Sequence, residues 1–258
     1  MALFDSHNHL QKFADPARII AAMRAAGISG CIVNGTSEDD WEAVARLAEA
    51  FPDFVRPAFG LHPWFAHRRS ARWHAVLEGF LDRFPDSSIG EIGVDGWVNE
   101  PSPAVQREVF LPQLALARDR KRPVTIHALK AWEPLLEGLA AEPVERFLLH
   151  SFGGSPELAE RLAGLGAWFS FSGYFLHPRK AKVLEAYRAV PADRLLLETD
   201  APEMLPPLEF IGHPLPEDQN HPANLPRIAG GLAEALGTDT ASLTERTAAN
   251  HLRFFGAT

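Results

Sequence analysis

The chain has 258 residues, of which 46% are hydrophobic and 22% charged, and its formal net charge at pH 7 is −8. This composition is typical of an ordinary soluble globular protein that is long enough to bury a large core. The negative charge argues against a protein that holds polyanions through its overall electrostatics, because such proteins usually show a basic footprint. The single cysteine, Cys31, excludes a disulfide framework and a cysteine-based zinc cluster.

The sequence shows no signal for a membrane or for export. It contains no run of 18 apolar residues, so we expect no membrane span. A charged residue, Asp5, stands at the fifth position, where a signal peptide would have its apolar core. We therefore expect a cytoplasmic protein without membrane contact, and nothing in the sequence indicates an obligate protein partner.

Short apolar runs alternate along the chain with segments whose apolar residues recur at helical spacing. This alternation is typical of a parallel sheet in which helices connect successive strands. Proline placement agrees, because Pro16 and Pro103 suit first helical turns and Pro123 suits the start of a strand. Clear predicted helices cover residues 16–26, 38–51 and 103–121. The eight predicted strands cover residues 3–5, 30–34, 56–60, 88–92, 124–127, 147–150, 168–172 and 195–198.

Eight strands with intervening helices in about 250 residues predict a single (β/α)8 TIM barrel. An open doubly wound sheet would show the same alternation, but no G-x-G-x-x-G follows a predicted strand, which disfavours a Rossmann fold. No low-complexity linker interrupts the chain, so we expect one domain over residues 1–258. The proline-rich stretch 201–226 is the longest irregular segment, and we interpret it as a functional loop over the site.

Imidazole or carboxylate side chains stand at the ends of five of the eight predicted strands. His7 and His9 follow the first strand at alternate positions, which places them on one face of an extended chain. The other four strand ends carry Glu91, His127, His150 and the run Glu198-Thr199-Asp200. The carboxyl ends of barrel strands form the face where active sites of this fold lie.

Each of these residues alone is compatible with a structural role. A histidine at a strand end is usually hydrogen-bonded in the fold, Glu91 would serve as a helix cap, and Asp200 before Ala-Pro would start a turn. Together they would bury several ionisable groups, and each unpaired charge would cost several kcal/mol. Divalent metal ions compensate carboxylate charge and take neutral imidazoles as ligands. The pattern therefore predicts a metal centre at the carboxyl ends of the strands.

A series of short motifs extends over almost the whole chain in a fixed order. These motifs are residues 5–10 (DSHNHL), 60–63 (GLHP), 89–95 (IGEIGVD), 106, 110 and 113–114 (Q, F, QL), 122–127 (RPVTIH), 150–154 (HSFGG), 171–173 (FSG), 198–202 (ETDAP), 224–226 (NLP) and 247–250 (TAAN). With them the chain resembles the TatD-related metal-dependent deoxyribonucleases of the amidohydrolase superfamily. The D-x-H-x-H motif alone is shared by many metallohydrolases, but the ordered set is highly specific.

The resemblance implies a (β/α)8 barrel with two divalent metal ions. By this resemblance, one metal ion would be bound by His7, His9 and Asp200 and the other by His127 and His150, and Glu91 would bridge the two ions. Nitrogen and oxygen ligands without thiolate suit Zn²⁺, Mn²⁺ or Mg²⁺, and four imidazoles favour zinc or manganese.

Three further residues receive roles in catalysis or substrate contact. Asp200 is the natural general base or proton shuttle, since it would contact metal and water at once. His62 lies just beyond the third predicted strand, where it would contact a phosphate or leaving-group oxygen or serve only as a structural loop histidine. Trp64 would form a stacking wall for the substrate or remain a half-buried loop aromatic.

The chain departs from the family pattern at two places that bear on the substrate. The family commonly has an arginine two residues after the histidine of the fifth strand, whereas this chain has Leu129 there and Lys130 next to it. The segment between Arg194 and Arg227 contains no Lys or Arg. The loop that follows Asp200 within this segment, referred to below as the acidic segment, contains the acidic residues Glu203, Glu209, Glu217 and Asp218. Basic residues instead follow the third strand (Arg68, Arg69, Arg72) and the seventh (Arg179, Lys180, Lys182).

These observations predict a metal-dependent hydrolase, most simply a deoxyribonuclease or phosphodiesterase that contacts DNA or a short oligonucleotide briefly and cleaves single strands, 3′ ends or damaged sites. The acidic segment and the missing arginine keep a second function open, hydrolysis of a small ester, lactone or amide by the same activated water. A binding protein with one structural zinc is a third alternative, although D-x-H-x-H sites usually keep an open coordination position.

Overall fold

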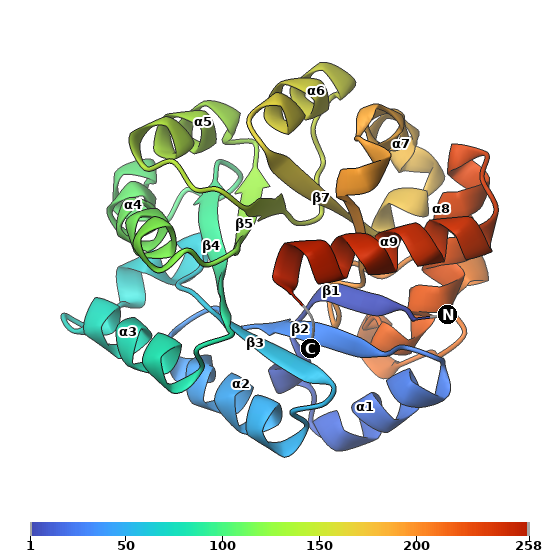
Figure 1. The fold of residues 1–258 in the computed structure, drawn as a ribbon, viewed down its shortest axis with the longest axis horizontal. Coiled ribbons are helices and arrows are strands. Elements are labelled where there is room, and N and C mark those ends of the chain that lie inside the picture. The colour runs from blue at the N-terminus through green and yellow to red at the C-terminus, as the bar shows by residue number, and fades with distance from the viewer. Residues whose placement is uncertain (1, 257–258) are drawn as a thin grey trace. The chain divides into compact units, whose positions relative to one another are not determined.

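The computed structural model describes residues 2–256 (Figure 1). Within it the chain divides into two compact units, of which the first comprises residues 2–33, 53–55 and 151–256 and the second residues 34–52 and 56–150. The prediction of a single domain stays a prediction.

Eight strands form one sheet in the order β1-β2-β3-β4-β5-β6-β7-β8. Neighbouring strands pair in parallel, as between β4 and β5 and between β7 and β8. The first and last strands of this order, β1 and β8, lie side by side in the first unit. Sequential order, parallel pairing and intervening helices are the fold of a (β/α)8 barrel, which confirms the predicted class. The strands are β1 Phe4–Asn8, β2 Gly30–Asn34, β3 Val55–Phe59, β4 Ser88–Asp95, β5 Val124–Leu129, β6 Phe147–Leu149, β7 Ala167–Ser172 and β8 Leu195–Glu198.

Nine α-helices are present in the described residues, and each of the three predicted helices ends one residue earlier than expected. They are α1 Pro16–Ala25, α2 Glu38–Ala50, α3 Trp73–Arg83, α4 Pro103–Arg120, α5 Trp132–Ala141, α6 Pro156–Gly164, α7 Ala181–Ala189, α8 Leu225–Leu236 and α9 Thr240–Phe255. In the second unit, α2 to α5 lie outside the strands that they connect, and in the first unit α9 lies across β1 (Figure 1).

Local sequence explains where these helices begin. The Asp15 side chain accepts a hydrogen bond from the backbone of Arg18 at 3.1 Å, and Pro16 occupies the first turn of α1. Ser37 and Asp40 form a capping box at the start of α2. Asp239 caps α9 in the same manner as Asp15 caps α1, with a distance of 2.8 Å to the backbone nitrogen of Ser242.

Three strands end later than the sequence predicts, and the first of them, β1, continues to Asn8 instead of residue 5. β4 continues to Asp95 and β5 to Leu129, because their pairing continues from Gly93 opposite His127 to Asp95 opposite Leu129. Polar residues do not end a strand when backbone pairing goes on. Glu91 therefore lies inside β4 rather than at its end.

Each unit has its own aromatic core. In the first unit, Phe171 packs edge-on against Tyr187 with 4.8 Å between ring centroids, and the Tyr187 hydroxyl donates to the Ser170 carbonyl at 2.7 Å. In the second unit, the fully buried Trp41 donates from its indole nitrogen to the Gly60 carbonyl at 2.9 Å and packs against Phe80. Buried aromatic area of this kind is the main stabilising contribution around the strands.

The proline-rich segment 201–226 belongs to the first unit and is ordered by two asparagines. Asn220 donates to the carbonyls of Thr199 and Met204, and the Asn224 side-chain oxygen accepts from the backbone of Gly212 and His213. Short 3-10 helices lie at Leu10–Lys12, Pro63–Arg68, Gly173–Leu176, Pro178–Lys180, Ala192–Arg194, Leu208–Phe210, Pro216–Asp218 and Pro222–Asn224. No helix in residues 2–256 is long and apolar enough to cross a membrane.

Candidate metal centre and active site

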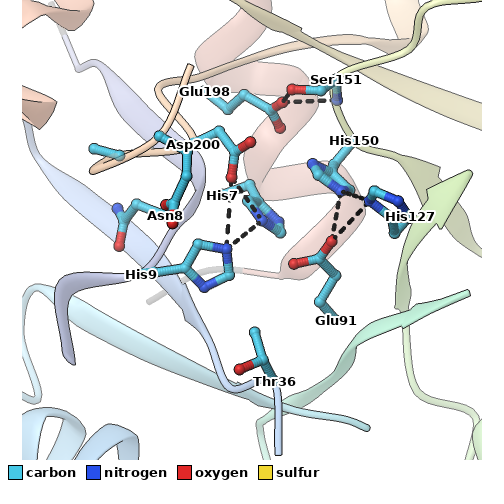
Figure 2. A network of polar contacts seen from close by, with 12 residues as sticks. His7, Asn8, His9, Thr36, Glu91, His127, His150, Ser151, Glu198 and Asp200 are labelled. Carbon is cyan, nitrogen blue, oxygen red and sulfur yellow. Dashed lines mark hydrogen bonds and ion pairs between the residues drawn. The ribbon is translucent and has the colours of Figure 1, made fainter. Parts of the chain in front are cut away.

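In the first unit, His7, His9 and Asp200 converge at the carboxyl ends of β1 and β8 (Figure 2). The Nε2 atoms of the two histidines are 3.3 Å apart. The Asp200 Oδ1 atom lies 3.3 Å from His7 Nε2 and 3.5 Å from His9 Nε2. All three residues are buried. The prediction that His7 and His9 lie on one face of the chain is therefore confirmed.

Backbone geometry and a buried carboxylate hold this group in place. Asp200 has a left-handed backbone with φ of 54°, a strained conformation that is often found at functional sites. Its backbone nitrogen donates to the His7 carbonyl at 2.9 Å, which fixes the end of β8 against β1. Asp5 accepts from the Thr199 hydroxyl at 2.6 Å and from Asn8 at 3.0 Å. Burial raises the pKa of Asp5 to about 7, although its hydrogen bonds oppose the shift.

In the second unit, the Glu91 carboxylate faces the imidazoles of His127 and His150 (Figure 2). Its Oε1 atom lies 2.8 Å from His150 Nε2 and 3.2 Å from His127 Nδ1. His62 Nε2 lies 3.1 Å from the same oxygen. His150 Nε2 and His127 Nδ1 are 3.4 Å apart. The second unit therefore collects three histidines on one buried carboxylate oxygen.

In two of these histidines, the ring nitrogen that faces away from Glu91 makes a hydrogen bond, and this bond assigns the tautomer. His62 Nδ1 accepts from the backbone nitrogen of Trp64 at 3.2 Å, so its proton is on Nε2 and is donated to Glu91. His127 Nε2 lies 2.8 Å from Asp95 Oδ2 and donates to that carboxylate. The Nδ1 lone pair of His127 is then directed at the Glu91 side, as a metal ligand requires.

The electrostatics keep Glu91 ionised. Burial raises the pKa of Glu91, but the neighbouring His150, His62 and His127 outweigh it and hold the pKa well below its usual value. Burial lowers the pKa of His62 to about 4, so this imidazole is neutral at neutral pH. Burial also lowers the pKa of His127, but contacts with Asp95 and Glu91 outweigh it and raise the pKa overall. The result is an anionic oxygen held among imidazoles.

Three residues to which the sequence analysis assigned no role hold the residues around Glu91 in place through hydrogen bonds. Asp95 accepts from the Trp64 indole nitrogen at 2.7 Å and from the Trp97 backbone at 2.7 Å. Gln106 on α4 accepts from the Asp95 backbone nitrogen and donates to its carbonyl. Gln113, two turns further along the same face of α4, accepts from the Leu61 backbone nitrogen and donates to the Leu61 carbonyl, and Leu61 precedes His62.

A signal for the two glutamines is present in the sequence. Gln106 and Gln113 are seven residues apart on the same helical stripe as Val109, Phe110 and Leu114, and all five are buried. A polar residue on the buried stripe of a helix must find a hydrogen-bonding partner, so such a position predicts a side chain that clamps a neighbouring loop.

Glu198 is a fourth residue to which no role was assigned. This fully buried carboxylate accepts from the backbone and hydroxyl of Ser151, at 2.7 and 2.6 Å, and from the Ser170 hydroxyl. Ser151 follows His150 in the chain and has a left-handed backbone with φ of 44°. Glu198 therefore fixes the turn that comes directly after a candidate metal ligand.

The donor atoms in each unit fit a divalent metal ion. In a tetrahedral site with metal–ligand distances of about 2.1 Å, ligand atoms lie about 3.4 Å apart. The first-unit donors are 3.3–3.5 Å apart, and the pairs among Glu91, His127 and His150 are 2.8–3.4 Å apart. Residues His62, Glu91 and His127 also place ligand atoms within 4.8 Å of one another. Both sets contain only nitrogen and oxygen donors, which suits Zn²⁺, Mn²⁺ or Mg²⁺.

Comparison with known sequences decides the family. A sequence model described as TatD related DNase matches residues 4–256. The chain belongs to the TatD-related DNase family. Among TatD relatives, the 3′-5′ ssDNA/RNA exonuclease TatD of Klebsiella pneumoniae (strain 342) is 35% identical over 248 residues, which cover 94% of this chain and 92% of the relative. The protein of the same name from Erwinia tasmaniensis is 34% identical over 245 residues, which cover 93% of each chain.

Solved structures of TatD proteins agree in fold. The crystal structure of YJJV, a TatD homologue from Escherichia coli K12, matches with a TM-score of 0.89 at 26% identity and covers 99% of this chain and 98% of its own. A TatD family hydrolase from Entamoeba histolytica gives the same TM-score at 16% identity, with coverage of 99% and 98%, and shows the fold alone.

Three of the basic side chains that follow β3 and β7 have partners within their own units. Arg69 pairs with Glu108 at 2.6 Å. Arg179 and Lys180 both lie over the Tyr174 ring, with 5.3 and 4.9 Å to its centroid. In the acidic segment, Glu203 pairs with Lys12 at 2.9 Å, which compensates one of the negative charges of that segment.

Proposed function

We propose that the chain is a divalent-metal-dependent nuclease that hydrolyses phosphodiester bonds of single-stranded DNA or RNA from the 3′ end. The observation that carries the proposal is the buried Glu91 carboxylate with three imidazoles on one oxygen, in a chain whose relatives of 34–35% identity are 3′-5′ ssDNA/RNA exonucleases. The His7, His9 and Asp200 group supports it independently.

In this proposal, each group of donors holds one divalent ion. His7, His9 and Asp200 bind one, and His127 and His150 bind the other together with Glu91. Bound metal ions lower the pKa of water and neutralise charge on the attacked phosphate and the leaving oxygen. That Glu91 bridges both ions stays a prediction from the family resemblance.

The protein groups then orient ligands and move protons. Asp200 is the general base, because its carboxylate stands at the ligand atoms of His7 and His9 and its own backbone is locked by the His7 carbonyl. His62 donates its Nε2 proton to Glu91 and so keeps that carboxylate in one orientation. This contact favours a positioning role for His62 over the substrate contact expected from the sequence.

The proposed substrate is bound through brief contact with few phosphates. A net charge of −8 opposes a long nucleic-acid footprint, and the basic side chains Arg69 and Arg179 already have partners. An exonuclease needs to hold only the end of one strand, which is compatible with this charge.

The test is the product pattern from a 5′-labelled single-stranded oligonucleotide with Mg²⁺, Mn²⁺ or Zn²⁺. The proposal predicts a ladder that shortens from the 3′ end, no ladder from an oligonucleotide with a blocked 3′ end, and little activity on blunt duplex. A panel of small esters, lactones and amides runs in parallel. Turnover of that panel without any cleavage of oligonucleotides would replace the nuclease with the small-substrate hydrolase that the acidic segment and Leu129 leave open.

A further inference from the structure

Large apolar side chains are exposed beside the metal-binding group of the second unit. Trp64, Trp97 and Leu129 are 46%, 65% and 37% exposed. Trp64 follows β3, Trp97 follows β4, and Leu129 is the last residue of β5. The chain reaches His62 just after β3, whereas β4 carries Glu91 and β5 carries His127. Exposed aromatic residues that gather next to a catalytic group indicate a binding surface.

Asp95 fixes Trp64 and Trp97 to one another, and Leu129 lies opposite Asp95 on the neighbouring strand. The Asp95 Oδ2 atom accepts from the Trp64 indole at 2.7 Å, and the Oδ1 atom accepts from the Trp97 backbone at 2.7 Å. Leu129 is the residue paired with Asp95 across β4 and β5, and its carbonyl accepts from the Gly96 backbone at 2.7 Å. The surface is therefore built on strand ends.

The same carboxylate connects this surface to the candidate metal ligands. Asp95 Oδ2 also binds His127 Nε2 at 2.8 Å. The Trp64 ring lies edge-on to His127 and to His62, with centroid distances of 6.1 and 5.0 Å. A flat ligand against the tryptophans would thus lie next to the reacting group.

A cation stands at the edge of the surface. Lys130 has a left-handed backbone with φ of 52°, and its Nζ atom lies 4.0 Å from the centroid of the Trp97 ring. The amine covers one face of the indole, yet 65% of Trp97 stays exposed. Aromatic faces with an adjacent cation match the chemistry of a nucleotide, which has a flat base and an anionic phosphate.

We propose that Trp64, Trp97 and Leu129 form a platform that stacks a nucleobase at the end of a single-stranded substrate, while Lys130 contacts a phosphate of the same strand. The proposal rests on the nuclease function proposed above and names how that site selects its substrate. Leu129 ends β5, is 37% exposed and directly precedes Lys130, so an apolar side chain and a cation are adjacent in the chain at this strand end. We refer to the three residues as the base platform.

The test is binding of a single-stranded deoxyoligonucleotide with phosphorothioate linkages, which resist hydrolysis, measured by fluorescence anisotropy with the protein in the presence of Mn²⁺. One oligonucleotide is intact, and a second has abasic residues at its last two 3′ positions. The Trp97→Ala variant is expected to bind the intact strand about 5- to 150-fold more weakly, because base–aromatic stacking has that magnitude. The abasic strand is expected to bind the variant and the unmodified protein equally.

Two controls exclude general effects of substitution. Trp97→Phe keeps an aromatic face and is expected to restore most of the affinity. Leu165→Ala removes another exposed apolar side chain, 56% exposed and in the first unit, and is expected to change nothing. Lys130→Gln is expected to weaken binding of both strands and to reduce the slope of log Kd against log salt by about 1.

The outcomes separate this proposal from the nuclease function. Equal affinity of Trp97→Ala and the unmodified protein for the intact strand, or equal loss with both strands, would overturn the base platform. Base-dependent binding together with no metal-dependent cleavage would retain the platform and reject the nuclease. Absence of any binding to the intact strand would overturn the platform, even if cleavage is observed at high substrate concentration.

Discussion

Replacing Asp95 by asparagine tests whether this carboxylate positions His127 in the second unit. The carboxylate accepts three hydrogen bonds, from the Trp64 indole at 2.7 Å, the Trp97 backbone at 2.7 Å and His127 Nε2 at 2.8 Å. An asparagine of the same shape has one oxygen and one NH2 group. With the oxygen toward Trp64 and His127, the NH2 group faces the Trp97 N–H, and one bond is lost.

The expected magnitudes follow from that count. Hydrogen bonds to a charged group contribute about 1.5–3 kcal/mol each, so Asp95→Asn is expected to lower the free energy of unfolding by about this amount. The weaker acceptor also releases the tautomer of His127. Loss of a carboxylate behind a metal-binding histidine typically weakens metal affinity about 10- to 100-fold.

Urea denaturation and isothermal titration with Mn²⁺ or Zn²⁺ measure the two effects separately. Asp86→Asn, which changes an exposed aspartate before β4, is the matched control and is expected to alter neither. If Asp95→Asn binds metal with unchanged affinity while its stability falls, Asp95 has only a structural role and the positioning of His127 is refuted.

Two further predictions concern stability. Burial lowers the pKa of His221 to about 4, and its Nδ1 accepts from the Ala223 backbone at 2.9 Å, so the folded state holds this ring neutral while the unfolded chain binds a proton below its usual pKa of 6.5. The free energy of unfolding is therefore expected to fall as the pH decreases from 6.5 toward 4. The His221→Asn variant keeps a hydrogen-bond acceptor but does not titrate, so its melting temperature should fall less over that interval. Identical pH profiles of the melting temperature for the variant and the unmodified protein would contradict this. Gly93 has φ of 145°, and an added Cβ would overlap the His127 carbonyl oxygen, so Gly93→Ala is expected to cost about 2–4 kcal/mol in urea denaturation. Gly79→Ala inside α3, where an added Cβ meets nothing within 4 Å, should instead stabilise by about 0.5–1 kcal/mol, and an equal effect of the two substitutions would disprove the steric argument.

The strand pattern predicted the fold because apolar runs report buried strands directly. β2 and β8 begin and end where the sequence predicts, at residues 30–34 and 195–198. β4 and β5 were predicted too short, because the residues that follow Ile92 and His127 are paired by backbone contacts that composition does not reveal. A run of apolar residues in the sequence indicates a strand that is buried on both faces. Backbone pairing between strands that continues through polar, functional residues leaves no such pattern in the sequence.

The candidate ligand residues are more conspicuous in the sequence than the residues that hold them in place. His7, Glu91 and Asp200 are conspicuous because ionisable side chains rarely end apolar strands. Asp95 lies beyond the predicted end of its strand, and two of its three donors, Trp64 and His127, belong to distant segments that only the fold brings together. Gln106 shows that a partial signal existed, since a polar side chain on a buried helical stripe requires a partner.

The central claim is that the two buried groups of donors bind divalent ions that are needed for phosphodiester cleavage. The most direct measurement is the cleavage rate of a labelled single-stranded oligonucleotide as a function of Mn²⁺ concentration, with metal-stripped protein and its Glu91→Gln and Asp200→Asn variants. The account predicts no cleavage without metal, recovery on addition of Mn²⁺, and variants that stay folded but are slower by about 100-fold or more. Cleavage that persists in chelator, or variants that cleave at the unmodified rate, would contradict it.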